Sequence, residues 1–99
     1  MFKIQSPNPK AEARSETTLT VPVHFYSYFK DLTGSAQVTE AVPTGSTIDA
    51  LLKRICSRFP KLAAMRNATL IAVGVEYQGR NYVLKQGDEV SLFPPVQGG

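Results

Sequence analysis

The last six residues of this 99-residue chain have the composition of a reactive terminus. They read Pro94-Pro95-Val96-Gln97-Gly98-Gly99, so the terminal carboxylate belongs to a glycine that follows another glycine. Two residues without side chains form a strip of backbone that could enter a channel too narrow for any Cβ, and the two prolines hold the approach extended. A frayed, glycine-rich terminus is the plain alternative, since such ends are common in folded domains.

Two side chains elsewhere, His24 and Cys56, are candidates for metal binding or catalysis. His24 is the one histidine of the chain, and no second ligand lies at a useful spacing from it. Cys56 follows Leu52 by four residues, at the edge of an apolar helical stripe, and has no partner that would activate a thiol. We therefore expect Cys56 to pack against the core. We predict no metal site and no catalytic acid or base of the domain's own near the tail.

The charge and composition of the chain exclude several classes of function. The net charge is +3, and the basic residues are scattered, with no run longer than the pair Lys53-Arg54. This pattern gives little support to a nucleic-acid interface. No apolar run approaches the length of a membrane span or of a secretory signal, and one cysteine cannot form an intrachain disulfide. We expect a single cytoplasmic domain that binds neither nucleic acid nor a membrane.

The elements that would position the tail begin after a polar segment. Residues 1–20 contain two prolines and no sustained period, which predicts a flexible N-terminal extension. Residues 21–30 then alternate between apolar and polar or aromatic side chains, as a strand with one face on the core does. A turn over 31–35 should return the chain as a second strand, 36–42. The outer face of the first strand would present His24, Tyr26 and Tyr28.

A helix is predicted from the apolar spacing that follows. Ser46 should cap its first turn, and Pro60 should end it. One side of this helix carries an apolar stripe that would cover one face of the sheet. The stripe consists of Ile48, Leu51, Leu52, Ile55 and Phe59.

Three short strands are expected after an irregular connection over 60–68. Residues 69–77 have the near-continuous apolar character of a central strand, which Gly74 interrupts with a bulge or a close backbone approach. A short strand over 82–84 and a last strand over 90–93 follow. In the last strand, the inward residues should be Val90 and Leu92.

The order of these elements predicts a two-layer α+β domain over residues 21–93, followed by a functional tail over 94–99. One main helix would cover one face of a mixed sheet of about five strands. The first and last strands should lie side by side, parallel and central.

A hairpin, a helix and further strands that end in a free Gly-Gly resemble the β-grasp, or ubiquitin-like, fold. Gly87-Asp88-Glu89-Val90, followed by Phe93 and the tail, is similar to the C-terminal signature of the small subunit of molybdopterin synthase. The aromatic segment 23–34 and the segment 59–73 fit the same family. The resemblance covers about residues 21–99, with Gly74 at a position where many relatives carry asparagine.

The resemblance implies a function for the tail. In this family a ubiquitin-activating-like enzyme adenylates the terminal carboxylate, here that of Gly99, with ATP, and the carboxylate becomes a thiocarboxylate. The tail then enters the large subunit of the synthase, where sulfur passes to cyclic pyranopterin monophosphate during molybdenum cofactor biosynthesis. The chain would be an accessory sulfur carrier in a heterotetramer, without catalytic machinery or a bound cofactor of its own. The inserted residues would be Gly98, Gln97, Val96, Pro95 and Pro94.

The resemblance also implies a partner interface. Hydrophobic contact positions of the family match Phe93, Tyr26 and Tyr77, and Lys30 lies at a position that is often basic. These aromatic residues should cluster if their strands are neighbours, and exposed apolar patches with aromatic anchors usually mark interfaces. Alternatively, the rings simply cover the open side of the sheet.

Three other functions remain open from the sequence. The chain could be a ubiquitin-like modifier joined through Gly99 to lysines of target proteins, because acyl-adenylate activation is common to carriers and modifiers. It could carry sulfur for thiamine or another small molecule, although the thiamine carriers usually lack the Pro94-Pro95 pair. It could also be an interaction domain with an inert tail.

Overall fold

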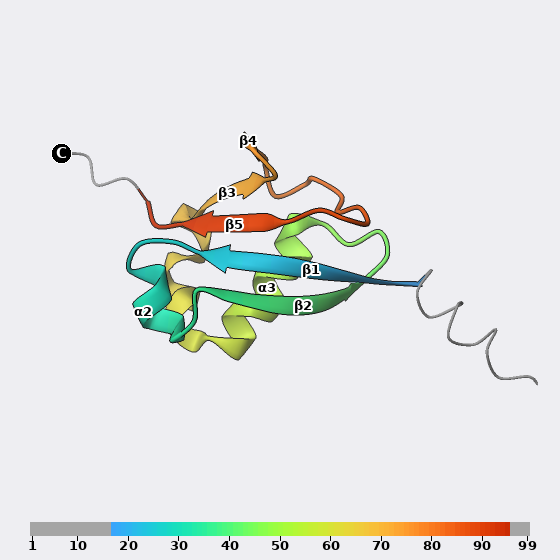
Figure 1. Cartoon of the computed structure of the whole chain (residues 1–99). Helices are drawn as coiled ribbons and strands as arrows, with labels where there is room; N and C mark the ends of the chain where they lie inside the picture. Colours follow the sequence, from blue (N-terminus) through green and yellow to red (C-terminus); the bar gives the residue numbers. More distant parts are fainter. Residues whose placement is uncertain (1–16, 96–99) are drawn as a thin grey trace, which may run out of the picture.

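The computed structural model of the chain describes residues 17–95. The five strands of this part form one mixed sheet in the order β2-β1-β5-β3-β4, with β5 at its centre (Figure 1). The elements in chain order are β1 (Thr18–Phe25), α2 (Phe29–Thr33), β2 (Gln37–Pro43), α3 (Ile48–Arg58), the 3₁₀ helix η1 (Pro60–Ala68), β3 (Leu70–Val73), β4 (Glu76–Tyr77) and β5 (Val90–Phe93).

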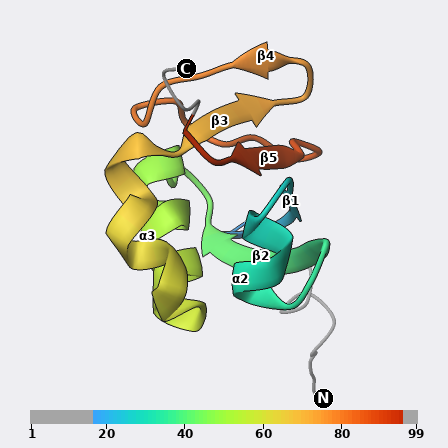
Figure 2. The same ribbon diagram turned by 90° about the vertical axis from the view of Figure 1, so that its left-hand side faces the viewer.

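The arrangement confirms the predicted two-layer α+β architecture. β1 and β5 are parallel neighbours, paired from Val23–Val90 to Phe25–Leu92, and the other three strand pairs are antiparallel. Figure 2 shows α3 on one side of the sheet. Among the helices that the structure describes, none is long and apolar enough to cross a membrane.

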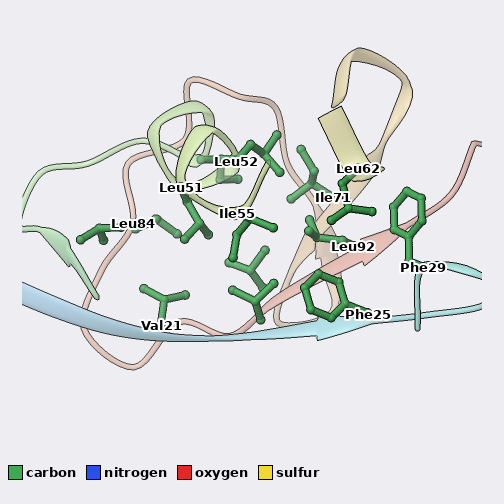
Figure 3. Packing of buried hydrophobic residues seen from close by; sticks show 14 of the residues in the cluster. Val21, Phe25, Phe29, Leu51, Leu52, Ile55, Leu62, Ile71, Leu84 and Leu92 are labelled. Atoms are coloured by element: carbon green, nitrogen blue, oxygen red, sulfur yellow. The ribbon is translucent and has the colours of Figure 1, made fainter. Parts of the chain in front are cut away.

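The hydrophobic core lies between the sheet and α3 (Figure 3). Alternation along β1 and β5 sends every second side chain inward, and the predicted stripe of α3 meets them. Phe59, the last residue of that stripe, is half-buried and contacts Phe25 edge-on, with ring centroids 5.6 Å apart. Burying each such side chain stabilises the fold by about 1.5–3 kcal/mol. The fully buried members include Val21, Val23, Phe25, Phe29, Ile48, Leu51, Leu52, Ile55, Val90 and Leu92.

The first strand begins and ends earlier than the sequence predicts. It starts at Thr18 instead of Val21, and Leu19 is already buried, so the N-terminal extension predicted over residues 1–20 is wrong for residues 18–20. Residues 1–16 of that extension lie outside the described part. Leu19 adds an inward side chain to the strand, because it continues the same period-two pattern as Val21.

The end of β1 differs from the predicted alternation over residues 21–30. Ser27 has a φ of 56°, in the left-handed region, and Phe29–Thr33 form the short helix α2. Tyr28 is therefore not on the outer face of a strand: it packs against the core, and its hydroxyl lies 3.6 Å from Met65 Sδ. The compact turn brings Phe29 into the core from α2.

The main helix has its cap one residue later than predicted. Thr47, in an extended conformation, accepts a hydrogen bond from Ala50 N–H at 3.3 Å through its Oγ1, whereas Ser46 Oγ donates to Pro43 O at 2.6 Å. Both Ser46 and Thr47 are residue types that favour the N-cap position, so the sequence alone does not choose between them. The backbone conformation places the Thr47 hydroxyl, and not that of Ser46, beside the free N–H groups of the helix. Pro60 ends α3 as expected but opens the 3₁₀ helix η1 instead of an irregular connection.

The segment 69–77 is a hairpin and not one continuous strand. Gly74 has a φ of 62° and turns the chain between β3 and β4, which leaves Val75 99% exposed at the turn. The positive φ, rather than a bulge, explains the glycine here. The strand predicted over 82–84 is reduced to a bridge between Val83 and Thr47, and the last strand is confirmed, with Val90 and Leu92 buried.

Candidate functional site

Three aromatic side chains gather on the face of the sheet opposite the core. The rings of Tyr26 and Phe93 are stacked, with centroids 4.8 Å apart and 11° between their planes. Tyr77 contacts Phe93 at 6.3 Å with 64° between the planes. Tyr26 is 42% and Tyr77 71% exposed. We call Tyr26, Tyr77 and Phe93 the aromatic cluster, and its existence confirms that the three rings meet as the sequence predicts.

The register of the central strands produces this cluster. Phe25 pairs with Leu92 and both are buried, so the residues that follow them, Tyr26 and Phe93, leave the strands on the opposite face. Tyr26 N–H donates to Leu92 O at 3.2 Å, which fixes the end of β1 beside β5. Tyr77 reaches the same face from β4, paired with Ala72 of β3. The three rings therefore come from β4, from β5 and from the residue that follows β1, which are distant from one another in sequence.

The tail leaves the domain at this cluster. β5 ends at Phe93, and Pro94 and Pro95 follow it directly without regular structure. Val96, Gln97, Gly98 and Gly99, which include the predicted reactive carboxylate, lie outside the described residues. The described part thus ends on a proline stem next to an exposed apolar surface.

An open hollow with acidic walls adjoins the aromatic cluster. It lies between the β3–β4 hairpin and the loop before β5, and Tyr26 is part of its lining. The carboxylate-bearing residues Glu76, Asp88 and Glu89 line it, and His24 Nε2 lies 3.1 Å from Glu89 Oε1 within it. A complementary surface would therefore be apolar opposite the rings and basic opposite the hollow.

Two features of this region are missed by the sequence patterns. Val75 extends the exposed apolar surface at the hairpin tip, but an apolar residue in an apolar run reads as a buried strand position. Glycine readily adopts a positive φ, as Gly74 does here, so this residue is the sequence signal that could have revealed the turn. The pairing of His24 with Glu89 joins residues 65 apart in the chain, and no local pattern predicts that.

Lys30 does not lie where the sequence predicts. It belongs to α2 and is exposed, because the chain has already left β1. The ring contacts of the aromatic cluster join its three members and do not involve Lys30. Its suggested role in an interface stays a prediction.

The remaining candidate for chemistry, Cys56, has the properties of a packing residue. It is partly buried against the core, and burial raises the pKa of its thiol above the ordinary value of 9.0, although the charge of Arg66 lowers it. A raised pKa keeps the thiol protonated and weakly nucleophilic at neutral pH. Within residues 17–95, no group of three or more His, Cys, Asp or Glu residues could hold a metal ion.

The sequence is similar to that of known sulfur carrier proteins. The sequence matches the ThiS family over residues 23–99. The human molybdopterin synthase sulfur carrier subunit is 35% identical over 82 residues, which cover 80% of this chain and 93% of the human protein.

Two solved structures show the same fold. A chain of the complex between subunits 1 and 2 of the molybdopterin-converting factor from Helicobacter pylori is 24% identical, with a TM-score of 0.58 over 82% of this chain and 100% of that chain. A ubiquitin from Caldiarchaeum subterraneum is 15% identical, with a TM-score of 0.60 over 83% of this chain and 99% of that chain. The five-stranded sheet and its main helix are thus the ubiquitin-like β-grasp fold that the sequence predicts. The chain belongs to the ThiS family, in the group of the molybdopterin synthase sulfur carrier subunits.

Proposed function

We propose that this chain is the sulfur carrier subunit of a molybdopterin synthase and that the carboxylate of Gly99 carries the sulfur. The observation that supports this most directly is the position of the Pro94-Pro95 stem, which follows the central strand beside the exposed aromatic cluster. A carrier needs a free, narrow terminus next to a surface that partners can recognise, and the stem that leads to the Gly-Gly sequence begins beside such an exposed apolar surface.

The chemistry follows from the low reactivity of a carboxylate. Neither of its oxygens is a good leaving group until ATP-dependent adenylation turns one into the oxygen of AMP. A sulfur nucleophile then displaces AMP and leaves a thiocarboxylate on Gly99. The sulfur of this group bonds to cyclic pyranopterin monophosphate, and water then cleaves the bond between that sulfur and the carbonyl carbon, which restores the carboxylate of Gly99. Two such transfers build the dithiolene that holds molybdenum. We assign the catalytic groups to a ubiquitin-activating-like enzyme and to the large subunit, and only the reacting carbonyl to this chain.

The length of the tail limits where these partners can place their reactive groups. An extended residue spans at most about 3.6 Å, so residues 96–99 reach no farther than about 14 Å beyond Pro95. An enzyme that takes up Gly99 must therefore approach the base of the tail, where the aromatic cluster lies. The prolines restrict the unbound tail, which lowers the entropy lost when a channel closes around it.

We assign the aromatic cluster to the docking of the large subunit, in a heterotetramer. Large, rigid rings are frequent anchors of interfaces because they bury much area with little loss of conformational entropy. Tyr26 and Phe93 are already stacked on each other, so this part of the surface is ordered before binding. Lys30 would contact the same partner from α2.

The decisive experiment is the intact mass of the full chain after incubation with ATP, a sulfur donor and a cognate activating enzyme. We expect one oxygen to be exchanged for sulfur. A chain without Gly99 should show no change, since its carboxylate would end one residue short of the reaction site. The activating enzyme must first be shown to act on another carrier.

The outcome separates the candidate functions. An unchanged mass of the full chain would reject the sulfur-carrier function and favour an interaction domain. Isopeptide-linked products in cells that lack deconjugating activity would instead indicate a protein modifier. A Gly99→Ala variant that carried and transferred sulfur at the normal rate would contradict the narrow-channel argument, since it adds only a Cβ at the tip.

A further inference from the structure

Three backbone acceptors on the outer edge of β2 are occupied by donors from elsewhere in the chain. β2 is one of the two edge strands of the sheet, paired on one side with β1. Arg58 Nη1 donates to Thr39 O at 3.0 Å, and Arg54 Nη1 donates to Ala41 O at 3.2 Å. Pro43 O accepts from both the backbone N–H and the Oγ of Ser46, at 3.1 and 2.6 Å. These three carbonyl groups belong to alternate residues of one strand.

The strand pairing explains why these carbonyls point outward. In an antiparallel pair, the N–H and C=O of one residue point to the same side, and the direction alternates along the strand. Thr39 pairs with Pro22, which has no N–H to donate, so this is a pair without mutual hydrogen bonds. Thr39, Ala41 and Pro43 therefore all direct their carbonyls away from β1, toward the place where another strand would add.

The two arginines reach this edge from the helical layer. They are four residues apart on α3, so they lie on the same side of that helix. Arg58 Nη1 also lies 2.5 Å from Glu40 Oε1, which holds the guanidinium against β2. Pro43 itself cannot donate to an added strand.

We propose that Arg54 and Arg58 keep the β2 edge from pairing with a strand of a second molecule. An edge strand with free N–H and C=O groups is a template for strand addition, and natural sheets protect such edges with charges and prolines. Here the guanidinium groups take the acceptors themselves and place positive charge along the edge. Strand addition at β2 would have to displace both arginines, whereas the edge formed by β4 lies at the opposite side of the sheet.

The test compares two double variants of the full chain that lose the same charge. Arg54→Ala with Arg58→Ala opens the edge, whereas Lys53→Ala with Lys61→Ala removes two exposed cations of the helical layer, of which Lys53 pairs with Asp49 of the same helix. The weight-average mass should be measured over a range of concentrations by sedimentation equilibrium. We expect a mass that rises with concentration for the arginine variant, and the mass of one chain for the native protein and the lysine variant.

Amide hydrogen exchange identifies the edge that pairs. Thr39 and Ala41 direct their N–H groups outward with their carbonyls, so pairing through β2 should slow their exchange in the associated arginine variant. Equal association of both double variants would overturn the proposal in favour of a general charge effect. A folded arginine variant that stays monomeric would also overturn it.

Folding of the variants is checked by thermal unfolding. Arg54→Ala alone keeps the contact between Arg58 and Glu40, so it tests the same edge with less loss of stability. If the double variant does not fold, slower exchange at Ala41 in this single variant at high concentration supports the proposal, and unchanged exchange rejects it.

Discussion

The two faces of the sheet place apolar side chains in opposite environments. On the inner face, Val23, Phe25 and Leu92 are fully buried against the helical layer. On the outer face, Tyr26 directly follows β1 and Phe93 ends β5, each one residue beyond a buried side chain, and both remain in contact with solvent. Because side chains alternate along a strand, adjacent residues serve stability and, under the proposed function, recognition. Substitutions one position apart should therefore separate the two properties.

The largest effect on folding is expected on the inner face. Leu92→Ala should lower the free energy of unfolding by about 2–5 kcal/mol, because it leaves a cavity beneath the central strand. Urea denaturation followed by circular dichroism would measure this loss. Ser91→Ala, on the outer face of the same strand, is the control, and a similar loss in that variant would contradict the division between the faces.

The largest effect on recognition is expected from the outer face. Phe93→Ala should weaken binding of the large subunit by about 2 kcal/mol or more, since it removes the ring that both tyrosines contact. Its cost in stability should be smaller, near the roughly 0.5–1.5 kcal/mol of an aromatic pair. Titration calorimetry and denaturation give the two values. If stability fell more than binding, Phe93 would belong to the core and not to an interface.

A change outside both faces should alter folding modestly and leave recognition intact. Thr47→Ala removes the side-chain acceptor for Ala50 N–H at the start of α3, which should cost about 1 kcal/mol. Thr47→Ser retains a hydroxyl and should restore most of that stability. Denaturation curves of the two variants would show the difference, and a strong effect of Thr47→Ala on binding would show that the helical layer also takes part in recognition.

The smallest effect on stability is expected from Cys56, which lies at the border of the core. Burial raises the pKa of its thiol, so alkylation at neutral pH should be slower in the folded chain than in the denatured chain. The same shift favours the thiol in the folded state, and the stability it contributes should be lost as the pH rises above 9.0, where the thiolate of the unfolded chain forms. Cys56→Ala should remove this part of the alkaline destabilisation. Equal alkylation rates in both states would place Cys56 outside the protected core.

Patterns with a strict local cause were predicted correctly from the sequence. The inward residues Val90 and Leu92 and the apolar stripe of α3 follow from periods of two and 3.6, and Pro60 ends the helix because of its own geometry. The meeting of Tyr26, Tyr77 and Phe93 depends on which strands are neighbours, and periodicity does not give this; the resemblance to a known family is what singles out these three residues.

The wrong predictions concern places where a contact between distant residues, or a backbone angle, determines the local structure. The alternation through residues 21–30 does not reveal that Ser27 takes a positive φ, after which Tyr28 faces the core and Lys30 lies on a helix. Gly74 indicates that the strand predicted over 69–77 is interrupted. Glycine occurs both at bulges and at hairpin turns, so the residue type does not show that the chain reverses here. Contacts between distant residues, such as those of Arg54 and Arg58 with β2, leave no local trace in the sequence.

The central position of β5 also has a mechanical consequence. A tail gripped by a partner transmits any pull to the end of β5, which is flanked by β1 on one side and β3 on the other. The force acts along the strand, so the hydrogen bonds to both neighbours are loaded in shear at the same time. An edge strand such as β4 could instead peel away one bond after another. Under the proposed function, the strand that leads to the tail is thus hydrogen-bonded on both sides while the tail enters and leaves an enzyme.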